Sequence, residues 1–147
     1  MRSSTIERAM RQHGETRDAF LGVFASDQLP VPPKRRTVAL IANTDPSNKQ
    51  GQHWCAFYIT PSCVYYFDSY GFPPLVKSFE RLLRCRRRRQ VFGRRLQGRG
   101  SACGYYCMYF ILAMLRGDHT LMERFGDDLN ANDRIVRNEV GRNFRIT

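Results

Sequence analysis

Apolar side chains occupy nearly every position of the stretch Cys103–Arg116, and this stretch constrains the fold more than any other feature of the chain. A helix that is apolar on all sides has to be buried among other elements, because no face of it suits water. The stretch is shorter than the ~20 residues that a membrane-spanning helix needs. We therefore expect a helix in the middle of a folded domain, with Ser101 as its cap and Gly117 as its end.

The chain before this helix predicts a β-sheet for the helix to pack on. Residues Thr37–Asn43 are almost entirely apolar, which is typical of an interior strand. Two further strands, Trp54–Ile59 and Cys63–Phe67, are separated by a short turn around Pro61 and predict a β-hairpin. A turn centred on Pro61 would place His53, at the open end of the hairpin, opposite Asp68 or Ser69.

Weaker patterns predict the rest of the architecture. Helices are expected at residues 3–14, Leu75–Cys85, His119–Phe125 and Asp133–Val140, a short strand around Val91 and Phe92, and a polar loop over Asp45–Gln52. The 147 residues suit one domain, so we expect a single domain over residues 1–147. The N-terminus has no signal-peptide pattern, and we expect no membrane association and a cytosolic or nuclear setting.

Positive charge is concentrated in one segment of the chain. The net charge is +11, and residues 81–99 contain nine arginines and no acidic residue. Arginine suits bidentate contact with phosphate, so this arginine-rich segment predicts a surface for a polyanion, most plausibly nucleic acid. The alternative is a solvated charge run that only keeps the protein soluble. The expected nucleic-acid contacts are Arg86, Arg87, Arg88, Arg89, Arg94 and Arg95.

The five cysteines favour neither disulfides nor a metal site. Their number is odd, and the chain is not a small secreted scaffold, so a disulfide framework is not expected. The sequence contains no Cys-x-x-Cys pair, and His13 and His119 lie near the chain ends, so we expect no structural zinc. Cys55, Cys63 and Cys107 are interpreted as small core residues.

Cys103 is different, because it stands at the start of the apolar helix. Free backbone N–H groups and the positive end of the helix dipole lower a thiol pKa at that position and favour the nucleophilic thiolate. Gly98 and Gly100 allow a sharp approach to the helix. The amide of Gln97 could reach the backbone N–H of Cys103, and two such donors would form an oxyanion hole.

A histidine beside a carboxylate completes a set that suffices for a cysteine peptidase. His53 would act as the general base and Asp68 would orient its imidazole. Each residue alone has a simpler interpretation: a core cysteine, a hydrogen-bonded loop histidine or a turn-forming aspartate. The order of the four residues, each in a suitable local context, favours catalysis over four independent coincidences.

These motifs resemble those of the adenoviral cysteine proteases (the adenain family) and, more distantly, the ubiquitin-like-protein-specific proteases that share their fold. The resemblance covers about residues 4–116 and is carried by His53-Trp54, by Tyr66-Phe-Asp-Ser-Tyr-Gly71 and by the segment from Gln97 to Cys107. It implies an α+β fold, in which a mostly antiparallel sheet packs against the nucleophile-bearing helix. It also implies Cys103 as nucleophile, His53 as general base, Asp68 as its orienting acid and Gln97 as an oxyanion donor.

The resemblance implies a biological setting as well. A protease of this type would cleave viral capsid and core precursor proteins as a monomer, in the virion and the host nucleus. Adenoviral proteases use DNA and a viral peptide as cofactors, and Cys85 lies in roughly the region where that peptide attaches by a disulfide, although the motifs do not assign it this role. Asp68 in place of glutamate, and a Gln-to-Cys spacing one residue shorter, match the ubiquitin-like-protein proteases instead.

Two other functions are therefore open at this point. One is a deubiquitinase or SUMO-type isopeptidase, which would share the chemistry and differ in the cleft that accepts the substrate. The other is a nucleic-acid-binding domain without catalysis, which rests on the arginines alone and predicts an ordinary thiol pKa for Cys103 and steeply salt-dependent binding.

Overall fold

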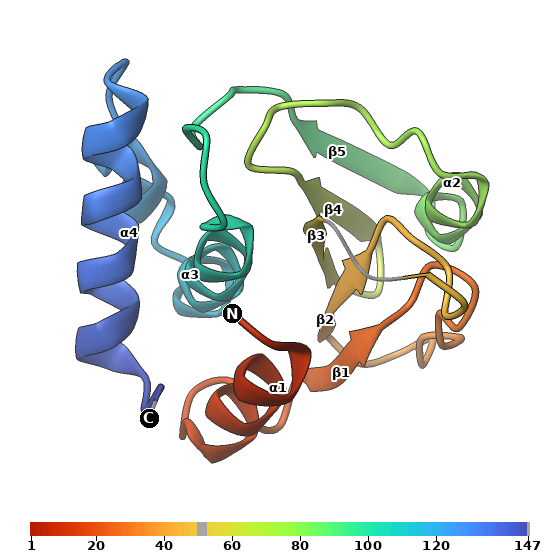
Figure 1. Ribbon diagram of the computed structural model, residues 1–147. Helices are drawn as coiled ribbons and strands as arrows, with labels where there is room; N and C mark the ends of the chain where they lie inside the picture. The colour runs from red at the N-terminus through yellow and green to blue at the C-terminus, as the bar shows by residue number, and fades with distance from the viewer. Residues whose placement is uncertain (50–52, 147) are drawn as a thin grey trace.

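The computed structural model describes residues 1–49 and 53–146, so residues 50–52 of the expected loop lie outside the described residues. Five strands form one sheet with helices on both faces (Figure 1). In chain order the elements are α1 Ser3–Gln12, β1 Phe20–Phe24, β2 Val38–Asn43, β3 Trp54–Ile59, β4 Cys63–Phe67, α2 Lys77–Leu83, β5 Arg88–Phe92, α3 Cys103–Arg116, the 3-10 helix η1 His119–Arg124 and α4 Leu129–Asn143.

The strands lie in the order β1-β2-β3-β4-β5. The two central pairings, β2 with β3 and β3 with β4, are antiparallel, and each outer strand joins its neighbour in parallel. Every residue of β2 is buried, as the apolar run over this segment predicts. The α+β class, with a sheet packed against the helix that carries Cys103, is confirmed.

The sheet separates two hydrophobic cores. On one face α3 packs against β3, and α1 and α4 pack against α3 in turn (Figure 1). On the other face α2 covers a smaller cluster of side chains that includes Leu40, Phe57, Tyr66 and Phe79. Alternation along β3 and β4 sends neighbouring side chains to opposite cores, which is why the inner strands are apolar on both faces.

The apolar helix is buried as its sequence requires. Eleven of its residues, from Cys103 to Met114, are buried. Gly117 ends the helix in the left-handed conformation, with a φ of 64°. The expected Ser101 cap is wrong, because Ala102 occupies the cap position and no side chain caps the helix. The first backbone N–H groups of α3 are therefore left for groups other than a cap.

Other expected boundaries also shift, each for a local reason. Helix α2 is shorter than predicted, and Leu75 lies outside it with 79% of its surface exposed. Helix α4 is longer than predicted and is capped by Asp128, which accepts from the backbone N–H of Ala131. Asp133, the expected cap, instead accepts a 2.7 Å hydrogen bond from the Tyr106 hydroxyl and thereby ties α4 to α3.

The hairpin has the predicted strands but a register one residue away from the prediction. Ile59 pairs with Val64 and Ala56 with Phe67, because the turn centres between Pro61 and Ser62 rather than on Pro61. Thr60 fixes this turn, since its backbone N–H and its hydroxyl both contact Cys63. Continued past the paired strands, this register brings His53 beside Tyr70.

Part of the arginine-rich segment is itself a strand. Arg88–Phe92 forms β5, which pairs in parallel with β4 and leaves the side chains of its first four residues exposed. As an outermost strand with charged residues, β5 matches the way in which proteins discourage unwanted pairing at a sheet edge. No helix in the described part of the chain is long and apolar enough to cross a membrane.

The packing of α3 generates a stability prediction. Phe110 stacks on Phe67 with ring centroids 4.8 Å apart and meets the edge of Phe92 at 5.1 Å. We expect Phe110→Ala to lower the free energy of unfolding by about 3–5 kcal/mol, as measured by urea denaturation. Phe72→Ala is the matched control, because Phe72 is 55% exposed. Equal effects of the two substitutions would contradict the central role of α3 packing.

Candidate active site

The site begins at the open end of the hairpin, where His53 and Asp68 meet. His53 directly precedes β3 and Asp68 directly follows β4. The Nε2 atom of His53 lies 2.8 Å from Oδ1 of Asp68, and both side chains are largely buried. This bond leaves Nδ1 as the imidazole nitrogen that can exchange a proton with another group.

The same carboxylate is held from the chain that follows it. The backbone N–H of Tyr70 donates to Oδ1 of Asp68 at 2.8 Å, and the backbone N–H of Gly71 donates to the Asp68 carbonyl at 2.8 Å. The ring of Tyr70 lies 4.7 Å from that of His53, centroid to centroid. These contacts fix the carboxylate and cover one face of the imidazole.

Cys103 joins this pair from the start of α3. The groups that act on the pKa of its thiol are His53 and the backbone N–H groups of Trp54 and Gly104. Burial acts to raise the pKa of Cys103, but these three partners and the charge of His53 outweigh it, and the pKa is lowered. Next to it, Gly104 lets the start of α3 pack closely on α1, since a β-carbon there would lie 3.0 Å from the Cδ1 atom of Ile6.

The pKa of His53 shifts in the opposite direction, upward. Burial acts to lower its pKa, but the neighbouring Asp68, Cys103 and Cys55 together raise it. A lowered thiol pKa beside a raised imidazole pKa favours a thiolate–imidazolium pair. The fold therefore brings the predicted histidine, acid and cysteine together, with a hydrogen bond between His53 and Asp68 and with His53 and Cys103 acting on each other's pKa.

Gln97 is fully buried, and its amide faces the loop that leads into α3. Its Nε2 donates to the Gly100 carbonyl at 3.0 Å and has a longer contact of 3.5 Å with the Tyr70 hydroxyl. Its Oε1 accepts from the Ser69 hydroxyl. Gly98, expected to give a substrate close access, is buried against α4 and donates its backbone N–H to Asp133.

Three residues of the site could also hold a metal ion by their types. The ligand atoms of His53, Cys55 and Asp68 all lie within 4.8 Å of one another. Hydrogen bonds account for this approach, because His53 binds Asp68 and the Tyr66 hydroxyl donates to the Cys55 thiol at 3.1 Å. Burial also raises the pKa of Cys55, which disfavours the thiolate that a metal would need. The absence of a metal stays a prediction.

Sequence reasoning missed Ser69, Tyr70 and Cys55 as neighbours of the site. Ser69 and Tyr70 stand inside the motif that contains Asp68, so their proximity could have been noticed from that motif. Cys55 was interpreted as a core residue, and it is fully buried, but its side chain also touches His53. Side-chain direction at the hairpin end decides these contacts, and a one-residue register error hides them.

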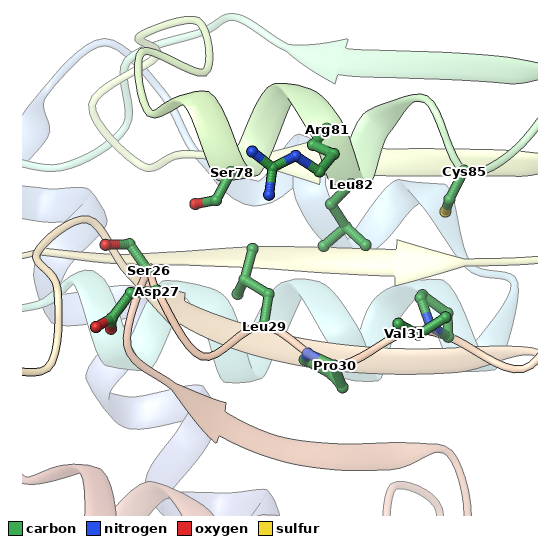
Figure 2. A pocket seen from close by; sticks show the side chains of 10 residues that line it. Ser26, Asp27, Leu29, Pro30, Val31, Ser78, Arg81, Leu82 and Cys85 are labelled. Atoms are coloured by element: carbon green, nitrogen blue, oxygen red, sulfur yellow. The ribbon is translucent and has the colours of Figure 1, made fainter.

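The structure contains one groove at the site and a second groove away from it. One borders His53 and Asp68 and is lined mainly by apolar groups, with Thr44, Tyr66, Tyr70, Phe72, Pro73, Leu75 and Val76 as its other residues. The second lies between α2 and the loop that follows β1 (Figure 2). Leu29, Val31 and Leu82 line it together with Arg81 and the half-buried Cys85, and neither His53 nor Cys103 reaches it.

Four of the six arginines predicted to contact nucleic acid bind other groups of the protein, and the other two have exposed side chains. Arg86 donates to the carbonyls of Thr60, Cys85 and Pro33, and Arg94 donates to those of Phe125 and Gly126. Arg95 donates to the Gln97 carbonyl and lies over the Tyr70 ring. Arg89 pairs with Glu80. Arg87 and Arg88 have exposed side chains.

The Cys103 environment generates a prediction about alkylation. Because the folded state lowers the pKa of Cys103, its thiolate should persist below the ordinary thiol range of about 8.5. His53→Ala removes the side chain that lowers this pKa most, while burial still raises it, so the midpoint of alkylation should move to higher pH. Peptide mass spectrometry after iodoacetamide labelling measures this midpoint. Cys107 is the internal control, since burial raises its pKa; the same Cys103 midpoint in both proteins would refute the thiolate–imidazolium pair.

Comparison with known proteins places this geometry in a known fold. No protein-family model and no curated protein sequence matches the chain. A crystal structure of the ASFV pS273R protease is similar with a TM-score of 0.61, covering 99% of this chain and 67% of that chain at 17% identity. A selenomethionine crystal structure of the same protease aligns with a TM-score of 0.49 and 24% identity, over 76% of this chain and 45% of that chain. The chain thus shares the fold of a protease, with Cys103 at the start of its central helix.

Proposed function

We propose that this protein is a viral cysteine endopeptidase of the adenoviral type, which cleaves capsid and core precursor proteins during virion maturation. The observation that carries the proposal is the 2.8 Å bond between His53 and Asp68, together with the Cys103 thiol at the start of a buried helix, where His53 lowers its pKa. The fold shared with a protease supports the reaction class. The precursor substrates and the virion and host-nucleus setting come from the motif resemblance.

The chemistry follows from the positions of these groups. The Cys103 thiolate attacks the carbonyl carbon of the scissile peptide bond, so that a C–S bond forms and the oxygen becomes an oxyanion. The oxyanion re-forms the carbonyl as the C–N bond breaks, and the His53 imidazolium gives its proton to the leaving amine. Water, deprotonated by the neutral imidazole, then hydrolyses the thioester and releases the acid with regeneration of Cys103.

The oxyanion needs donors, and two are proposed. The backbone N–H of Cys103 lies in the first turn of α3, where no side chain caps the helix. The second donor is the Gln97 amide, which is buried beside the loop that enters α3. Buried donors of this kind stabilise an oxyanion more than solvated ones do, because little water competes for them.

A deubiquitinase or SUMO-type isopeptidase is the second candidate function. Asp68 as the acid and the short Gln-to-Cys spacing favour it. The endopeptidase and the isopeptidase would use the same Cys103 chemistry and differ in the substrate that enters the cleft. A binding protein without catalysis is a third hypothesis, and the lowered pKa of Cys103 beside the His53–Asp68 pair argues against it.

Two cofactors are proposed, DNA and an activating peptide. For DNA, the Arg86 bond to Pro33 brings Lys34, Arg35 and Arg36 beside the arginine-rich segment, so that the exposed charges of both join one basic surface. For the peptide, the apolar groove at Cys85 is the proposed place of contact, because it combines an accessible thiol with apolar walls (Figure 2).

Peptidase activity is tested with a proteome-derived peptide library whose cleavages are identified by mass spectrometry. We expect Cys103→Ala to abolish cleavage and Asp68→Asn to reduce it on the order of 10²-fold or more. Since the Cys103 pKa is lowered and the His53 pKa raised, activity should rise with pH through the former and fall through the latter. Cys63→Ser is the control cysteine variant.

The same assay separates the candidate functions. Cleavage of ubiquitin-like precursors in preference to the library would favour the isopeptidase. Full activity of Cys103→Ala would overturn every proposal that places the nucleophile at this position. Adding DNA or candidate viral peptides to the wild-type reaction then tests each proposed cofactor separately.

DNA association is tested by its dependence on salt. We expect Arg87→Ala/Arg88→Ala to weaken binding to a random-sequence duplex and to reduce the slope of log affinity against log salt by about 0.9 for each lost phosphate contact. Fluorescence anisotropy over a salt series measures both quantities. Arg134→Ala/Arg142→Ala removes the same charge from α4 as a control. Equal losses in the two variants would indicate only a net-charge effect.

A further inference from the structure

Ser69 connects the two halves of the candidate site. Its neighbour Asp68 holds the imidazole, while its own groups hold the segment that carries the proposed oxyanion donor. The Ser69 carbonyl accepts from the backbone N–H groups of Leu96 at 2.8 Å and Gln97 at 3.0 Å. The Ser69 hydroxyl donates to the side-chain carbonyl of Gln97. One buried residue therefore binds Gln97 through both its backbone and its side chain.

The partners of Gln97 determine which end of its amide points where. The Gly100 carbonyl can only accept, so the group 3.0 Å from it must be the NH₂ end of the amide. The carbonyl end then faces Ser69, whose hydroxyl is its donor. Because Gln97 is fully buried, loss of this donor would leave a polar oxygen without its partner and free the amide to turn.

The orientation leaves one N–H of Gln97 weakly engaged. The NH₂ group has two hydrogens, and Gly100 takes one of them. Among the residues that the structure describes, the other has the Tyr70 hydroxyl at 3.5 Å as its contact, which is at the limit of a hydrogen bond. That N–H is therefore the one that a substrate oxyanion could take.

The turn that contains Ser69 is closely packed against the segment around Arg95. Gly71 has a φ of 76°, and a β-carbon there would lie 2.7 Å from the backbone nitrogen of Arg95. The guanidinium of Arg95 lies 5.6 Å from the centroid of the Tyr70 ring, which in turn covers His53. The chain around Gln97 is thus packed directly on the turn that holds the imidazole.

We propose that Ser69 is a positioning residue for catalysis, which fixes the Gln97 amide so that one N–H points at the developing oxyanion. The inference rests on the proposed function, because it needs an acyl-transfer reaction at Cys103. It separates the roles of adjacent residues in one turn: Asp68 acts on the formation of the thiolate, and Ser69 acts on the stabilisation of the oxyanion.

Two reactions of Cys103 distinguish these roles. In alkylation by iodoacetamide, the thiolate displaces iodide from carbon and no oxyanion forms. In acylation by p-nitrophenyl acetate, the thiolate adds to the ester carbonyl, an oxyanion forms, and p-nitrophenolate leaves as the carbonyl is restored. Both rates are measured on the full chain as a function of pH, with labelling of Cys103 confirmed by mass spectrometry.

We expect Ser69→Ala to reduce the acylation rate by about tenfold or more, while the rate and pH midpoint of alkylation stay unchanged. Gln97→Ala should show the same pattern. Ser69→Ala/Gln97→Ala should be no slower than Gln97→Ala alone, because Ser69 acts through Gln97. Ser69→Cys, which is close in size and has a weak S–H donor, should show a smaller loss and covers the case in which the alanine variant folds poorly.

Four outcomes would overturn the inference. If Ser69→Ala slows alkylation and acylation equally, the residue supports the thiolate or the fold and not the oxyanion. If the losses of the single variants add in the double variant, Ser69 does not act through Gln97. If wild-type Cys103 alkylates at low pH but is never acylated, both the proposed function and the role of Ser69 fail. If the wild type is acylated normally and Ser69→Ala is acylated at the same rate, only the role of Ser69 is contradicted.

Discussion

Burial of α3 between the sheet and α4 is the constraint on which the rest of the structure depends. A helix without a polar face needs apolar partners on every side, and β3, α1 and α4 supply them. The start of the helix is thereby fixed against the open end of the hairpin, where Gly104 allows contact with Ile6 and Trp54. Cys103 lies beside His53 as a consequence of this packing, because it is the first residue of the helix and the position of the helix fixes the position of its thiol.

The residues of the site are held in place by different kinds of contact. His53 and Asp68 flank paired strands, so sheet hydrogen bonds hold their backbones. Gln97 lies in an irregular segment and depends on the turn from Ser69 to Gly71 for its position. The imidazole and the proposed oxyanion donor are therefore linked through one short turn. A change in that turn can affect either group, and which one it affects depends on the atom that is altered.

Local patterns predicted the elements better than they predicted contacts. Both hairpin strands and α3 have the predicted bounds, because apolar periodicity and turn residues define them locally. The hairpin register was wrong by one residue, since Thr60 and Cys63 close a turn whose centre no periodic pattern reveals. The contacts of the arginines were also hidden, because Arg86 and Arg94 donate to carbonyls of segments that are distant in sequence.

The sequence by itself determined the helix that must be buried, the strands on which it packs, and the residue types available for chemistry, because these depend on side-chain polarity along short stretches. Only the tertiary structure decided which nitrogen of His53 binds Asp68, what Cys103 and Gln97 contact, and which arginines remain exposed. These features depend on the approach of segments that are far apart in the chain. A shift of one residue or a few tenths of an ångström reverses them, and no local pattern records distances of that size.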